Sequence, residues 1–283
     1  VVIGAAILLR PLGMEGLLLG FVLGHVVLLV GMLLLVLRGY PSSRFIAFDF
    51  LKPRAMPVTL MLSGFLYNLA VWADKILFWF SGDTGVEVIG PLRASPVYDL
   101  PLFLAYLSII PGMAVFLTRM ETDFVEYYSR FYDKVRSGGT LDELEDLRDE
   151  MVLVIRQGLG EIVKIQSITI LAVFALSPAI LRSVGISELN LPLFHVHVIA
   201  AGLQVVLLGV LNVFFYLDKQ RIVVALTAFF TVTNFALSWV TIQAGAPYYA
   251  YGFALAALMT VLLAVTLLTR KLDTLEFETF MMQ

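Results

Sequence analysis

The sequence contains no cysteine and few charged residues. Without cysteine, disulfide bonds, thiol catalysis and cysteine-ligated metal sites are excluded. Only 14% of the 283 residues are charged, and the net charge of -3 gives no strongly basic face for nucleic acid. Apolar residues make up 60% of the chain, which excludes a soluble globular protein and a disordered chain and indicates a polytopic membrane protein.

Sequence motifs of common enzymes are missing as well. The chain has no Walker A motif, no H-E-x-x-H, no G-x-S-x-G and no Gly-rich dinucleotide fingerprint. Its longest polar stretch, residues 118–153, is too short to hold a glycosyltransferase or kinase domain. We therefore expect a protein that is not an enzyme, and predict neither a cofactor nor a metal site.

Seven apolar runs are long enough to cross a membrane as α-helices, which requires about 20 residues. They cover residues 12–37, 57–80, 97–117, 154–177, 192–217, 222–243 and 247–269. Residues 1–9 look like the end of an eighth run, so we interpret the chain as the C-terminal part of a longer protein. The runs do not alternate between apolar and polar residues, and they predict an all-α polytopic transmembrane bundle.

Lysine and arginine are unevenly distributed between the loops. If every run crosses the membrane, fourteen of the 19 basic residues fall in one set of loops and three in the other. Basic residues concentrate in cytoplasmic loops. The C-terminal tail, residues 270–283, is therefore expected on the cytoplasmic side of the membrane.

Residues 118–153 are predicted to form a cytoplasmic helical hairpin. Aromatic residues recur there at helical spacing, at Phe124, Tyr127, Tyr128, Phe131 and Tyr132. Gly138 and Gly139 break this first helix, and the segment from Thr140 to Glu143 matches a capping box that begins a second one. The aromatic face either packs against the second helix or docks a cytoplasmic partner.

Ionisable residues inside apolar runs are costly, so they mark cavities or ion pairs. Two runs, 57–80 and 154–177, contain such residues, and the run 97–117 carries a Pro-Gly pair that predicts a kink. We interpret these features as a hydrated conduit; the alternative is that the charges form ion pairs that fix helix packing. The candidate conduit residues are Asn68, Asp74, Lys75, Tyr98, Asp99, Glu161 and Lys164.

Three further features concern packing. Residues 16–24 contain the pattern G-x-x-x-G-x-x-x-G, which allows close approach of two helices. Pro178 is expected to follow a helix end. His195 and His197 point to opposite sides of a helix, which favours ordinary polar packing over a metal site or a proton relay.

Three long runs are specific enough to compare with known families. They are NLAVWADKILFWF at 68–80, GPLRASPVYDLPLFLAYLSIIPGM at 90–113 and METDFVEYYSRFYD at 120–133. These runs resemble the inner-membrane transporter family of the Pel exopolysaccharide system, the PelG family. The resemblance extends over essentially the whole chain.

The resemblance implies a fold similar to the multidrug/oligosaccharidyl-lipid/polysaccharide (MOP) flippase superfamily, with two six-helix lobes around a cavity. Residues 1–37 would be the last helices of a truncated N-terminal lobe, 38–56 a cytoplasmic interlobe linker, and 57–269 the C-terminal lobe. The implied function is export of a cationic amino-sugar exopolysaccharide for the biofilm matrix. The implied partners are a cytoplasmic glycosyltransferase and an inner-membrane receptor for cyclic di-GMP.

On the same resemblance, the acidic residues Asp74, Asp99 and Glu161 would contact the cationic polymer. The aromatic residues expected to stack on sugar rings are Tyr67, Trp72 and Tyr98. Two other functions stay open, an ion-coupled antiporter of lipid-linked sugars or drugs and a non-transporting scaffold for a synthase. The polar faces on two runs and the predicted kink favour transport over a scaffold.

Overall fold

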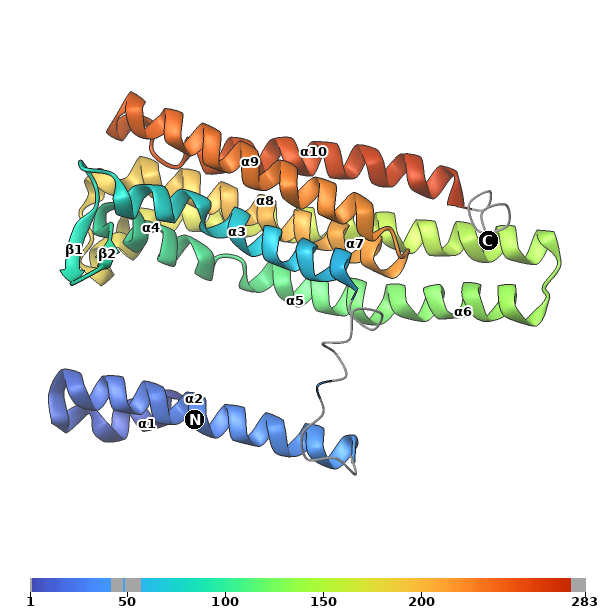
Figure 1. Ribbon diagram of the computed structural model, residues 1–283, viewed down its shortest axis with the longest axis horizontal. Coiled ribbons are helices and arrows are strands. Elements are labelled where there is room, and N and C mark those ends of the chain that lie inside the picture. Colours follow the sequence, from blue (N-terminus) through green and yellow to red (C-terminus); the bar gives the residue numbers. More distant parts are fainter. Residues whose placement is uncertain (1, 42–47, 49–56, 276–283) are drawn as a thin grey trace. The chain divides into compact units, whose positions relative to one another are not determined.

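The computed structural model describes residues 2–41, 48 and 57–275 (Figure 1). The chain divides into two compact units, Val1–Pro57 and Val58–Gln283. Among the described residues, six helical stretches are long and apolar enough to cross a membrane, or seven if one bent pair is a single span. The prediction of an all-α polytopic bundle is confirmed. Most of the expected linker 38–56, and residues 276–283 of the tail, lie outside the described residues.

The first unit consists of two helices that pack along each other. Helix α1 (Val2–Leu9) is joined by a 3-10 turn to α2 (Gly13–Gly39). A Cβ atom on Gly20 would lie 2.7 Å from the Cα of Ala6, and one on Gly24 would lie 2.5 Å from the Cα of Val2. The glycine run of α2 therefore provides the surface on which α1 lies, as the spacing predicted.

The second unit is a helical bundle arranged around one buried helix. Its elements are α3 (Val58–Phe80), β1 (Val86–Ile89), β2 (Leu92–Ala94), α4 (Pro96–Leu107), α5 (Ile110–Thr118), a π-helical turn (Arg119–Asp123), α6 (Phe124–Ser137), α7 (Leu141–Val184), α8 (Leu191–Tyr216), α9 (Gln220–Ala244) and α10 (Tyr251–Asp273). Helix α8 is the most buried and packs against α4, α7 and α10, while α9 packs between α3 and α10. The antiparallel pair β1–β2 was not predicted.

The predicted kink separates α4 from α5, which meet at an angle of 43°. Pro111 stands near the start of α5 and has no N–H, so the backbone one turn earlier loses a hydrogen bond. Gln166 of α7 donates from Nε2 to the carbonyl oxygen of Ser108 at the break, at 3.1 Å. A neighbouring helix thus satisfies a backbone group that the break exposes within the apolar run.

Helix α7 does not end before Pro178, so that expectation was wrong. It runs for 44 residues, about 66 Å at 1.5 Å per residue. Pro178 removes the donor for the carbonyl of Phe174, but the hydroxyl of Ser177 donates to that oxygen at 2.8 Å. The freed acceptor keeps a partner, which allows the helix to continue.

The predicted hairpin is formed by α6 and the first part of α7, which extend beyond the other helices (Figure 1). Gly138 ends α6 with a φ of 80°, a conformation that suits glycine. The capping box is present: the backbone N–H of Glu143 donates to Oγ1 of Thr140, and the N–H of Thr140 donates to Oε2 of Glu143 at 2.9 Å.

Candidate substrate groove and intramembrane polar cluster

Asp74 on α3 is fully buried and connects three helices. Its Oδ2 accepts a hydrogen bond from the hydroxyl of Tyr98 on α4 at 2.5 Å, and its Oδ1 accepts one from the amide of Asn234 on α9 at 3.2 Å. Asn234 is fixed in turn by Ser238, whose hydroxyl donates to its Oδ1 at 2.8 Å. Inside a membrane such polar contacts hold helices together, because few other donors and acceptors are available.

The ammonium group of Lys75 lies beside this carboxylate without being hydrogen-bonded to it. Its Nζ is 3.6 Å from Oδ1 of Asp74 and donates to a backbone carbonyl one turn earlier on α3 at 2.6 Å. The ring centroids of Trp72, Tyr106 and Phe253 lie 5.8, 5.4 and 5.3 Å from Nζ. The ring faces and the nearby carboxylate together offset part of the cost of a charge at this depth.

The surface between α3 and α4 is hollowed next to Lys75, with a volume of ≈ 400 Å³. The hollow is lined by Val71, Trp72, Lys75, Trp79, Asp99, Leu102, Phe103 and Tyr106. Trp72 is 47% exposed there, and Phe103 is 65% exposed. Asp99 is held in place because its Oδ2 accepts hydrogen bonds from Nε1 of Trp79 at 2.8 Å and from the N–H of Ser95 at 2.9 Å.

Helix α8 provides polar contacts between α3 and α4. The hydroxyl of Tyr106 donates to Oε1 of Gln204 at 3.0 Å, and Nε2 of Gln204 donates to the hydroxyl of Tyr67 at 3.2 Å. These three residues and the hollow together form what we call the α3–α4 groove. It combines exposed ring faces with one ammonium and one carboxylate, the mixture of apolar area and few polar groups that is typical of ligand sites.

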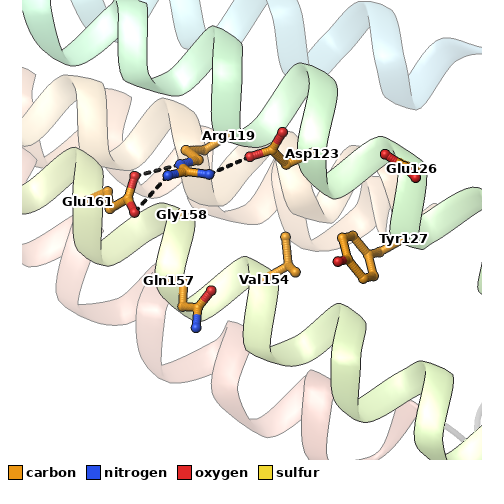
Figure 2. A pocket seen from close by; sticks show the side chains of 8 residues that line it. All are labelled: Arg119, Asp123, Glu126, Tyr127, Val154, Gln157, Gly158 and Glu161. Carbon is orange, nitrogen blue, oxygen red and sulfur yellow. Dashed lines mark hydrogen bonds and ion pairs between the residues drawn. The ribbon is translucent and has the colours of Figure 1, made fainter.

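A second hollow, ≈ 280 Å³ in volume, lies between the π-helical turn, α6 and α7 (Figure 2). Figure 2 shows Arg119 between Glu161 of α7 and Asp123 of its own turn. Its Nε donates to Glu161 at 2.5 Å, and its Nη1 donates to Asp123 at 2.6 Å. Glu126 and Tyr127 line the same hollow. The ion pair joins the π-helical turn to α7 where the hairpin begins.

The structure brings four of the seven conduit candidates together. Asp74, Lys75, Tyr98 and Asp99 surround the junction of α3 and α4, but Asp74 and Tyr98 are 0% exposed. Stacking of Tyr98 on a sugar ring is excluded in this conformation, because Tyr98 packs face to face with a phenylalanine, with ring centroids 3.8 Å apart.

The other three candidates lie elsewhere. Glu161 pairs with Arg119 in the second hollow and not with Lys164, which lies on the same face of its helix. Lys164 is exposed. Asn68 is also exposed, and its amide donates to a backbone carbonyl of its own helix at 2.8 Å.

The aromatic residues of the hairpin are divided between buried and half-buried positions. Phe124 and Phe131 are 0% exposed and belong to the core of the second unit. Tyr127, Tyr128 and Tyr132 are half-buried against that core. Two of the five candidate docking residues are therefore covered by the protein's own helices.

Sequence analysis missed the residues that α8 and α9 contribute. Gln204 and Asn234 are side-chain amides in the middle of long apolar runs, and such residues commonly form hydrogen bonds across helices. Their amide groups at membrane depth were the available signal. Within residues 2–41, 48 and 57–275, no group of three or more His, Asp or Glu side chains is arranged to hold a metal ion.

The comparisons with known proteins give one match. A family model described as "PelG: Putative exopolysaccharide Exporter (EPS-E)" matches residues 1–280. Neither a curated protein nor a solved structure matches the chain.

Proposed function

Because the chain belongs to the PelG family of exopolysaccharide exporters, we propose that it carries a polysaccharide across the bacterial inner membrane, with its C-terminus in the cytoplasm. The chain acts as a transporter and not as an enzyme. Its second unit corresponds to a six-helix C-terminal lobe of the MOP-flippase type, and its first unit to the last helices of an N-terminal lobe.

The α3–α4 groove is the observation that carries this proposal. Charged groups are costly in hydrocarbon. A carboxylate and an ammonium beside an exposed tryptophan are therefore not expected on a helix surface that contacts only lipid. In the groove, Trp72 and Phe103 offer ring faces while Lys75 and Asp99 offer charges. Ring faces suit the apolar faces of sugars, and the charged groups suit hydroxyl and amino groups.

The expected cargo is a cationic amino-sugar polymer destined for the biofilm matrix. Of the acidic residues considered, Asp99 is the one that lines the groove, whereas Asp74 is buried behind it. Contact with the polymer is therefore assigned to Asp99 in preference to Asp74. Glu161 remains a candidate at the second hollow, where an ammonium group of the polymer would compete with Arg119.

The proposed partners are a cytoplasmic glycosyltransferase that makes the polymer and an inner-membrane receptor for cyclic di-GMP. The projecting hairpin is the surface proposed for the glycosyltransferase. Tyr127 is half-buried at the second hollow, with the guanidinium carbon of Arg130 5.2 Å from its ring centroid. It is a better docking candidate than the covered Phe131.

The groove is tested by comparing two exposed tryptophans in the full-length protein. Trp72 lies in the groove, while Trp239 is 54% exposed on α9 and is not one of the residues that line it. Trp72→Ala is expected to lower polymer secretion by up to about tenfold, since a stacked ring contributes at most about 1.4 kcal/mol. Trp239→Ala is the matched control and should leave secretion unchanged.

Secretion is measured per molecule of membrane-inserted protein in the native host. Equal secretion by the two variants would remove the groove assignment and favour the scaffold function. Loss of secretion with Asp99→Asn but not with Trp72→Ala would favour the ion-coupled antiporter.

The partner is tested by co-purification in mild detergent. The glycosyltransferase should co-purify with the wild-type protein and be reduced with Tyr127→Ser, while a substitution on α9, outside the hairpin, Trp239→Ala, retains it. Co-purification that is unaffected by Tyr127→Ser would move the docking surface away from the hairpin.

A further inference from the structure

We propose that the hollow where α3 and α9 begin and α10 ends binds the phosphate group of an anionic phospholipid. The hollow has a volume of ≈ 590 Å³, within the range of about 300–1,000 Å³ that is typical of ligand sites. Its charged lining residues are Asp218, Lys219, Arg221 and Lys271, and we call it the basic hollow. Lipid binding there goes beyond the proposed export and does not depend on which cargo is carried.

The first argument is the sign of the charge. Among the described residues that line the basic hollow, Lys219, Arg221 and Lys271 are cationic and Asp218 alone is acidic, an excess of two positive charges. The cations come from two separate parts of the chain, the start of α9 and the last turn of α10. Cations gathered around one hollow repel each other, and a phosphate between them replaces this repulsion by charge-assisted hydrogen bonds.

Two acidic side chains lie close to these cations in the sequence, and both have other partners. Oδ1 of Asp218 accepts a hydrogen bond from Nε2 of Gln220 at 2.8 Å. Asp273, at the end of α10, does not line the hollow, and its carboxylate lies 3.9 Å from the guanidinium group of Arg156. Arg221 is exposed and forms no ion pair with any residue within 57–275. Its guanidinium group can therefore bind an external anion.

The wall of the basic hollow is fixed by contacts within the protein. The hydroxyl of Thr59 donates to Oε1 of Gln220, and Nε2 of Gln220 donates to Asp218, so one amide joins the start of α3 to the start of α9. Lys219 precedes α9 without forming a side-chain cap, and the N–H groups of the first helical turn suit the same anion. A site whose walls are already held in place binds its ligand with a smaller loss of conformational entropy.

The position of the basic hollow selects a lipid as the source of the phosphate. The apolar run 222–243 starts directly after Arg221, and the run 247–269 ends directly before Arg270 and Lys271. These cations therefore lie at the boundary of the hydrocarbon, at the level of the lipid head groups. This is the end of the bundle from which α6 and the first part of α7 project, the end proposed to face the cytoplasm (Figure 1). Basic pockets between membrane helices on that side bind anionic head groups.

The test measures lipid binding to the purified full-length protein in mild detergent by native mass spectrometry. The probes are dioleoylphosphatidylglycerol, which is anionic, and dioleoylphosphatidylcholine, which has the same acyl chains and no net charge. The wild type should bind phosphatidylglycerol more tightly. Arg221→Gln should weaken this binding about fivefold, which corresponds to about 1 kcal/mol for one basic residue beside an anionic lipid. The triple variant Lys219→Gln/Arg221→Gln/Lys271→Gln should weaken it about a hundredfold.

Arg270→Gln is the matched control, because Arg270 stands beside Lys271 in the last turn of α10 but does not line the hollow. It should leave the binding of phosphatidylglycerol unchanged. Arg221→Lys keeps the charge and should keep most of the affinity, which separates loss of charge from loss of structure. Arg221 is exposed, so Arg221→Gln is expected to fold even if the triple variant does not.

Equal weakening by Arg270→Gln and Arg221→Gln would overturn the proposal, because it would show only a general attraction between basic residues and anionic lipid. Equal binding of the two lipids by the wild type would overturn it as well. Displacement of phosphatidylglycerol by an equal concentration of glycerophosphoglycerol, its head group without acyl chains, would show a site for a soluble phosphodiester and overturn the lipid assignment. None of these results involves secretion, so the exporter and its α3–α4 groove are tested separately by Trp72→Ala.

Discussion

The contact between α9 and α10 leads to a sharp prediction for Gly252→Ala. A Cβ atom on Gly252 would lie 2.4 Å from the backbone nitrogen of Ser238, 2.5 Å from its Cα and 2.6 Å from the carbonyl carbon of Leu237. All three are backbone atoms of α9, so no side-chain rotation relieves the clash. The two helices have to separate.

The expected cost follows from two opposing effects. Overpacking costs about 1–3 kcal/mol, and a clash with rigid backbone belongs at the upper end of that range. Alanine in place of glycine within a helix stabilises the folded state by about 1 kcal/mol. The net destabilisation is about 2 kcal/mol, which corresponds to a fall in melting temperature of about 4–8 °C for a unit of this size.

The measurement is thermal unfolding of full-length protein in detergent, followed by tryptophan fluorescence. Gly64→Ala on α3 is the matched control, because a Cβ atom there meets nothing within 4 Å. This control should leave the melting temperature unchanged or raise it slightly. A Gly252→Ala protein as stable as the Gly64→Ala protein would refute the reasoning, since it would show that α9 and α10 are not in backbone contact.

Two further predictions concern the hairpin. Phe131→Ala removes a 0% exposed ring and should destabilise the protein by about 3–5 kcal/mol, seen as faster proteolysis of the hairpin, whereas Leu141→Ala at a 61% exposed position should not. Equal proteolysis of the two variants would show that Phe131 is not a packing residue. The pKa of Glu143 is lowered, first by the hydrogen bond from the backbone N–H of Thr140 and then by Lys134. A carboxylate with a lowered pKa stabilises the folded state above its unfolded pKa, and this contribution is lost as the pH falls through the folded pKa. The stability difference between the wild type and Glu143→Ala, measured by thermal unfolding against pH, should therefore shrink in acid and be constant near neutrality; a difference independent of pH would contradict the capping box.

The sequence by itself determined the elements that depend on local chemistry. Long apolar runs predicted the spans, because a chain in hydrocarbon has to satisfy its backbone within a helix. Thr140 and Glu143 predicted the start of α7, because a capping box involves residues only three apart. The glycine spacing in residues 16–24 predicted a close helix contact, because residues four apart lie on the same face of a helix.

The tertiary structure decided which polar residues meet. Pro178 did not end its helix because a neighbouring hydroxyl replaced the lost donor. Glu161 and Lys164 share a helix face, yet Glu161 pairs with Arg119, 42 residues earlier in the chain. The partner of Asp74 on α9 is Asn234, 160 residues away. Spacing along one helix predicts which side chains share a face, but which helix packs against that face depends on how the whole bundle assembles.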